Sequence, residues 1–434
     1  MITIFYSDEF VFDLAYIFLS LSSIFLFLFV WSRVEAIRPF YILFWSYFLF
    51  VILGGFYDGY SRFYSVTDEA KLISLVGFLS ILAGGLLARI AFPNSEAIIR
   101  KSFYSNQLGF SNSLVLVRLG LVALFIGWAG TGFVYYRMEV IPILSESPQY
   151  YRTRTLQGMG LFYHSSRYLI YFSLGLLALL SSCNRFSKLW LVFFIISSSI
   201  LLFGYAIRMN SAMAFAIPFL LFFCVKFYWD RFVIFYCALF LTGVLFLGGV
   251  LQYYRSYEYV KDQGILEFAF DAMLHRPWVQ IENVNHLVNG LGSGGAFLMS
   301  YYADLTKILP GANLPNGGVV LHDMLGLNFI GGGITPTLAG EAYVNIGWIG
   351  VLLVPLIYAF FIEGVYFFAA QKTRSSPNKE LYMVLLCLIS FMSLAVATST
   401  FFSSIIFQLA PALICFFLLV TIKPFLPRRR LKIL

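Results

Sequence analysis

The sequence predicts an all-α polytopic integral membrane protein, folded as a single membrane domain over residues 1–434. The first observation is composition: 60% of the residues are hydrophobic, 12% are charged and the mean hydropathy is +0.83. These values lie far outside the soluble range. The second is a series of apolar runs of about twenty residues, such as "LAYIFLSLSSIFLFLFVW" at 14–31, and each can cross a bilayer as a helix. The third is an uneven distribution of charge between the connections.

We expect about 11 transmembrane helices, beginning with the apolar run near the N-terminus. No basic segment precedes that run and no small-residue cleavage site follows it, so it is predicted to be a retained span. The hairpin "GYAIRMNSAM" between the sixth and seventh spans has a re-entrant turn as its alternative. The predicted spans are 12–31, 40–56, 72–92, 114–134, 161–182, 189–206, 212–228, 232–251, 345–370, 381–399 and 402–421.

Charge predicts an N-out, C-in orientation. With the N-terminus outside, the cytoplasmic side receives 18 Lys and Arg against 5 Asp and Glu, whereas the outer side receives 11 against 16. This split follows the positive-inside rule. The basic pI near 9.1 therefore reflects topology, and we expect no nucleic-acid partner.

The longest predicted connection, residues 252–344 between the eighth and ninth spans, faces outward and holds much of the polar chemistry. Its segments "GILEFAFDAMLH" and "WVQIENVNHLVNGL" predict short amphipathic helices at the interface or over a cavity. Glycine-rich turns near 290, 309 and 330 interrupt any longer helix. The five cysteines show no metal-like spacing, and no metal or nucleotide motif is present, so we expect no metal and no cofactor.

Arginine dominates the outer-side bases, with eight Arg against three Lys. Arg167 is predicted two turns inside the fifth span, and Arg208 caps the hairpin between the sixth and seventh. A charge inside a span usually faces a partner or a water-filled cavity, although an arginine near a helix end can also snorkel to lipid headgroups. Tyrosines beside these bases, as in "QYYRSYEY" at 252–259, fit an ordinary aromatic belt or a wall that stacks on sugar rings.

The candidates for proton transfer are His322, Asp323 and Glu341. A His–Asp pair in a glycine-rich loop has a solvated ion pair as its common alternative. Glu341 is predicted at the N-terminal edge of the ninth span, where a carboxylate also favours the helix dipole.

The stretches "YAIRMNSAMAFAIPF", which contains Arg208, and "GGGITPTLAGEAYVNIGWIG" at 331–350 complete the pattern. Together with one large outer loop late in an eleven-span chain, they resemble the Wzy-type O-antigen or oligosaccharide repeat-unit polymerases. The resembling part runs from Arg208 to Gly350, about a third of the chain, and the remainder is similar only in hydropathy.

The resemblance implies a glycosyltransferase in the bacterial cytoplasmic (inner) membrane. Its partners would be undecaprenyl-diphosphate-linked glycans and membrane lipid, with a chain-length regulator protein as a further candidate. A hydroxyl of one repeat unit would attack the anomeric carbon of another, and the carrier diphosphate would leave without ATP or metal. Arginines would stabilise the diphosphate and a carboxylate or histidine would take the proton. The residues expected to bind diphosphate are Arg208, Arg255 and Arg276, then Arg167 and Arg152, and the candidate bases are Asp323 or His322, then Glu341.

The glycines of 331–350 let the backbone turn sharply and approach a ligand, so we expect a cavity at this helix entrance, with close helix packing as the alternative. Three rival functions stay open. An O-antigen ligase would share the donor and the arginines. A flippase would distribute charge through the depth of many spans, and a membrane acyltransferase would place a histidine mid-span.

Overall fold

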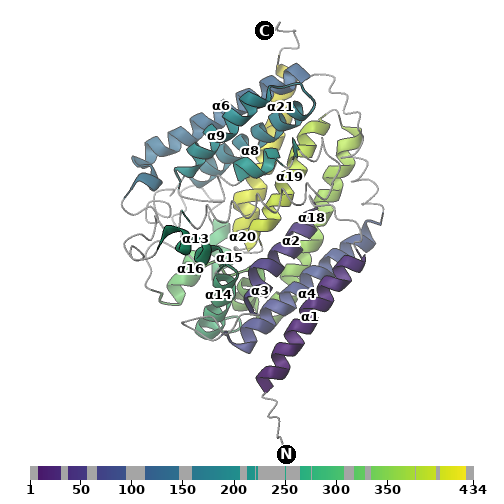
Figure 1. Cartoon of the computed structure of the whole chain (residues 1–434), viewed down its shortest axis with the longest axis vertical. Coiled ribbons are helices and arrows are strands. Elements are labelled where there is room, and N and C mark those ends of the chain that lie inside the picture. The colour runs from purple at the N-terminus through teal and green to yellow at the C-terminus, as the bar shows by residue number, and fades with distance from the viewer. Residues whose placement is uncertain are drawn as a thin grey trace, which may run out of the picture.

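The computed structural model describes residues 8–30, 38–55, 66–93, 113–145, 159–205, 213–219, 221–222, 250, 264–274, 276–306, 317–327, 334–376, 378–396 and 401–426. Within these ranges every regular element is a helix. The long helices pack side by side, and a group of short helices gathers at one side of the molecule (Figure 1). The protein is therefore all-helical, as the sequence predicts.

Helices cover ten of the eleven predicted spans wholly or in part, and of the eighth only residue 250 is described. The seventh is described only at 213–222, without residue 220. The N-terminal elements are α1 (Asp8–Val30), α2 (Pro39–Tyr47), the π-helical η1 (Phe48–Ile52), α3 (Leu53–Gly55) and α4 (Asp68–Ala91). The central elements are α6 (Ser113–Met138), η2 (Pro142–Leu144), α8 (Gly160–Ser182) and α9 (Lys188–Phe203). The C-terminal elements are α18 (Trp348–Ser375), α19 (Lys379–Val396), α20 (Phe401–Ser404), η3 (Ile405–Leu409), α21 (Ala410–Ile422) and η4 (Lys423–Phe425).

Three helices of the described chain are long and apolar enough to cross a membrane: α4, α6 and α18 over Trp348–Thr373. Shorter apolar helices cover Phe12–Leu28, Pro39–Gly55, Lys188–Phe203 and Ala410–Phe425. Large apolar side chains also face outward, including Phe25 on α1 and Leu189 on α9, which are 74% and 80% exposed. Soluble proteins rarely leave such continuous apolar faces uncovered, so these helices indicate a membrane protein.

The ninth predicted span, roughly 345–370, corresponds to α18, which begins three residues later than 345. Gly347 has φ +82°, a left-handed conformation that favours glycine, and it ends α17 (Leu338–Ile346) before α18 begins at Trp348. A Cβ at Gly350 would lie 2.5 Å from the carbonyl oxygen of Ala342. The described glycines of this stretch thus serve the turn and close packing, while the predicted cavity stays a prediction.

A buried ion pair joins α2 to α18. Arg38 Nε lies 2.7 Å from Glu363 Oε2, and the backbone N–H of Phe40 donates to Glu363 Oε1 at 3.0 Å. Arg38 and Glu363 are 2% and 3% exposed, so separating them would leave a charge in an apolar environment. The sequence predicts both residues on the same side of the membrane, the cytoplasmic one, and that orientation stays a prediction.

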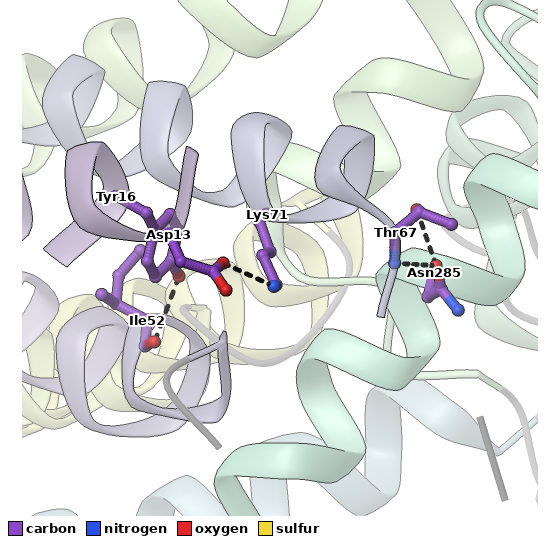
Figure 2. Close-up of polar contacts among 6 residues, drawn as sticks. All are labelled: Asp13, Tyr16, Ile52, Thr67, Lys71 and Asn285. Carbon is purple, nitrogen blue, oxygen red and sulfur yellow. Dashed lines mark hydrogen bonds and ion pairs between the residues drawn. The ribbon is translucent and has the colours of Figure 1, made fainter. Parts of the chain in front are cut away.

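A second set of polar contacts connects α1, η1, α4 and α14 (Arg276–Leu291), as Figure 2 shows. Lys71 Nζ lies 2.9 Å from Asp13 Oδ1, and the hydroxyl of Tyr16 donates to the Ile52 carbonyl at 3.1 Å. The backbone N–H and the hydroxyl of Thr67 both donate to Asn285 Oδ1, at 3.0 and 2.8 Å. Thr67 is the N-cap of α4, so its hydrogen bonds with Asn285 connect α14 to the beginning of a candidate span.

The described residues of the predicted outer loop form five short helices: α13 (Ile265–Leu274), α14 (Arg276–Leu291), α15 (Met299–Thr306), α16 (Gly317–Met324) and α17. The first two cover the segments for which the sequence predicts amphipathic helices. On α14, Ile281, Val284 and Leu287 are fully buried, because this face packs against η1, α3 and α4. The short helices of the predicted outer loop therefore pack against the rest of the protein.

Candidate functional site

Arg167 occupies the second turn of α8, as predicted, and aromatic side chains surround it. Its guanidinium carbon lies 5.5, 5.2 and 6.0 Å from the ring centroids of Tyr163, Tyr168 and Tyr171. Tyr163 and Tyr171 stand four positions before and after Arg167, so helical spacing places them on its face, whereas Tyr168 follows it directly in the sequence. Cation–π contacts in this partly buried setting hold the guanidinium against the tyrosine rings of its own helix.

His164 contributes a polar contact to this group. Its Nδ1 lies 2.9 Å from Arg167 Nη2. Because a guanidinium only donates hydrogen bonds, His164 Nδ1 accepts and this imidazole is neutral. Arg167, His164 and the three tyrosines form what we call the arginine cluster.

Further tyrosines extend this cluster toward α6 and the residues after α9. The rings of Tyr163 and Tyr205 lie 4.2 Å apart, and those of Tyr205 and Tyr135 lie 4.6 Å apart. Tyr205 is fully buried, and its hydroxyl has no hydrogen-bond partner among the described residues. A buried hydroxyl without a protein partner is uncommon, so a polar group of a ligand could form a hydrogen bond with it.

Glu341 lies in the first turn of α17 and is fully buried. Its Oε1 accepts a hydrogen bond from the Ser300 hydroxyl at 2.9 Å, and its Oε2 accepts from the backbone N–H of Phe401 at 2.5 Å. Asn345 Nδ2 donates in turn to Ser300 Oγ at 2.8 Å. The N-cap of α17 is Thr337, so Glu341 does not cap its own helix but the beginning of α20.

Asp304, also fully buried, is the second carboxylate of this region. Its Oδ1 accepts from the backbone N–H of Gly317, the first residue of α16, at 2.7 Å. Two buried acids thus each hold the N-terminus of a helix, where the helix dipole favours negative charge. We call Glu341, Asp304, Ser300 and Asn345 the carboxylate cluster.

The carboxylate cluster alters the acidity of Glu341. Burial, and secondarily the negative charge of Asp304, raise the pKa of the Glu341 carboxyl to about 8, although the hydrogen bonds from Phe401 and Ser300 oppose the shift. The sequence predicts Glu341 at the N-terminal edge of the ninth span; the structure places it on α17, a separate short helix that precedes α18, and buries it. A carboxyl with this pKa holds its proton at neutral pH, which weakens it as a general base.

His322 and Asp323 lie on α16 and not in a loop as predicted. Their contact is present, with His322 Nδ1 3.2 Å from Asp323 Oδ1. The His322 side chain is 8% exposed and that of Asp323 is 65% exposed. The pair therefore joins a buried imidazole to a solvent-facing carboxylate, which could pass a proton outward.

Most of the predicted diphosphate-binding arginines are untested by the structure. Arg208, Arg255 and Arg152 lie outside the described residues, and Arg276 begins α14 with its side chain outside them. Arg167 is the member of the set whose surroundings the structure describes. Within the described ranges, no group of three or more His, Cys, Asp or Glu side chains is placed to hold a metal ion.

Phe401 connects the carboxylate cluster to α18. Its backbone N–H binds Glu341, and its ring lies 5.8 Å from that of Tyr358 on α18. The tyrosine spacing around Arg167 is visible in "YHSSRYLIY" at 163–171, and helical periodicity could have identified it. Ser300, Asp304 and Asn345 carry no comparable signal, because their partners are distant in sequence.

Comparisons of this chain with protein-family models, with curated protein sequences and with solved structures found no match.

Proposed function

We propose that this chain is a glycosyltransferase that polymerises undecaprenyl-diphosphate-linked oligosaccharide repeat units on the outer face of the bacterial cytoplasmic membrane. The observation that supports this most is Arg167, a guanidinium held by His164 and three tyrosine rings inside a predicted span. A cation fixed before the substrate arrives suits a reaction whose leaving group is an anion.

In the proposed reaction, a hydroxyl oxygen of one repeat unit forms a bond to the anomeric carbon of a second unit. The bond from that carbon to the carrier diphosphate breaks, and the electron pair leaves with the phosphate oxygen. The hydroxyl proton passes to a base. The activated diphosphate linkage supplies the driving force, so no redox step or additional phosphate donor is required.

Arg167 would bind the departing diphosphate through its planar donors, assisted by Arg208, Arg255, Arg276 and Arg152. Charge-assisted hydrogen bonds of this kind contribute about 1.5–3 kcal/mol each. For the base, the surroundings favour Asp323 with His322, since Asp323 is exposed to solvent whereas Glu341 is buried and holds its proton at neutral pH.

Deletion of the gene, followed by sizing of glycans on the carrier lipid and on the final acceptor, tests the proposal. Single repeat units that reach the outer surface and are transferred without elongation would support a polymerase. Full-length chains that accumulate on the carrier would indicate the O-antigen ligase instead, and units retained on the inner face would indicate a flippase.

A further inference from the structure

The turn between α14 and α15 presents a row of large apolar side chains to the surroundings. Phe297 is 82% exposed, Leu298 is 47%, Met299 is 51% and Tyr302 is 60%. We call these four residues the apolar turn. No charged residue occurs from position 292 to position 303, so the exposed surface of this segment has no charged group of its own.

The backbone of the apolar turn is strained. Phe297 has φ +39° and Leu298 has φ +63°, and bulky residues seldom adopt this left-handed region. Glycine or asparagine would fit such positions with less strain. Two bulky apolar residues here indicate that their side chains serve a purpose that outweighs the conformational penalty.

The turn is held against α17. The backbone N–H of Gly294 donates to the Tyr343 carbonyl at 3.0 Å, and that of Ala296 donates to the Val344 carbonyl at 2.8 Å. Ala296 itself is fully buried. The adjoining side chains of Phe297 and Leu298 are therefore directed outward from a fixed backbone.

The position of the turn identifies what covers it. The last turn of α17 leads through Gly347 to Trp348, where the candidate membrane span of α18 begins. A Cβ at Gly347 would lie 2.7 Å from Ser293 Oγ, so the turn and the start of the span are in contact. At this junction Ile346, Trp348 and Ile349 are 43%, 37% and 65% exposed, and they continue the apolar surface.

We propose that the apolar turn inserts among the lipid acyl chains at the outer surface of the bilayer. Tryptophan and tyrosine mark the ends of membrane spans, and uncharged apolar segments partition into the boundary between headgroups and acyl chains. Insertion anchors α15, and with it Ser300 and Asp304 of the carboxylate cluster, at a set depth beside the beginning of α18. This inference requires a membrane-embedded protein but does not depend on the proposed reaction.

Site-specific photocrosslinking in native membranes tests the insertion. p-Benzoylphenylalanine replaces Phe297, the full-length protein is irradiated in cells, and mass spectrometry identifies the adducts. The same group at Ile349 of α18 gives the lipid-facing reference, and at Asp323, which is exposed and charged, it gives the matched control outside the patch. The expected result is a phospholipid adduct at position 297 in a yield like that at 349, with none at 323.

A protein adduct at position 297, from a second copy of this chain or from another protein, would overturn the proposal. So would the absence of a lipid adduct there while position 349 is labelled. Tyr302 provides a second position for p-benzoylphenylalanine one helical turn further on, so that failure of the first variant to accumulate leaves the test intact. Lipid labelling at 302 is expected, and protein labelling or none counts against insertion.

Discussion

The arginine cluster and the carboxylate cluster differ in how far along the chain their contacts reach. Arg167 is held by residues within four positions of it on the same helix. Glu341 is held by Ser300, 41 positions away, and by Phe401, 60 positions away. One cluster belongs to a single helix, whereas the other exists only when α15, α17 and α20 come together.

This difference separates two tasks that ionisable groups perform in a membrane protein. Ring faces position a guanidinium, and its planar donors suit a diphosphate. Both oxygens of Glu341 accept hydrogen bonds from other helices or their first residues. We therefore propose substrate binding for the arginine cluster, whereas the carboxylate cluster holds α15, α17 and α20 together.

The largest effect is expected for Arg167→Ala. Removing one preorganised donor from an anionic leaving group lowers turnover by about 10²–10³-fold, so glycan elongation should stop while the protein remains inserted. Arg167→Lys keeps the charge but loses the planar fork and should also be severely impaired. The measurement is the length distribution of the lipid-linked glycan. Arg185→Ala, at an exposed arginine after α8, is the control with normal lengths, and normal lengths in both Arg167 variants would refute the assignment.

The next largest effect is expected for Glu341→Leu, and it concerns stability. Leucine leaves the Phe401 N–H and the Ser300 hydroxyl without their acceptor in a buried setting, at a cost of about 1–3 kcal/mol for each group. Glu341→Gln retains one acceptor oxygen and should lose much less. Thermal unfolding of the purified protein in detergent checks both variants. Equal stability of Leu and Gln at this position would show that the hydrogen bonds contribute nothing.

A pH dependence is expected from the same carboxyl. Since the pKa of Glu341 in the folded protein, about 8, lies above its ordinary value of 4.5, the folded state holds a proton that the unfolded state releases. Its contribution to stability is complete below pH 4.5 and declines as the pH rises to about 8, by no more than about 1.4 kcal/mol per pH unit. Unfolding curves of the wild type and Glu341→Gln across this window give the measurement. Parallel curves for the two proteins would contradict the raised pKa.

The smallest effect is expected for Tyr168→Phe. Phenylalanine preserves a ring face near Arg167, so elongation should change by about tenfold or less, whereas Tyr168→Leu removes a cation–π contact of about 0.5–2 kcal/mol. Chain-length profiles of the two variants, compared with that of Arg167→Ala, test the role of the ring. Equal impairment by Phe and Leu would instead assign the positioning of Arg167 to the phenol oxygen.

By itself, the sequence determined the helical membrane character of the protein, the approximate extent of most described helices, and the depth of Arg167 in α8. Hydropathy and helical spacing are properties of neighbouring residues, and so they can be read without knowing the fold. Tyr163 and Tyr171 fall in this class, since an interval of four residues from Arg167 defines one helix face, whereas the contact with Tyr168 does not follow from that interval.

Only the tertiary structure decided the surroundings of Glu341, the break at Gly347, and the helical setting of His322 and Asp323. Apolar patterning specifies that a segment is buried but not which distant segment covers it. The partners of Glu341 come from α15 and α20, and they meet it only because the outer-loop helices pack against the membrane helices. The burial that follows from this packing, together with Asp304, changes Glu341 from an exposed helix-end carboxylate into a proton-holding group of the interior.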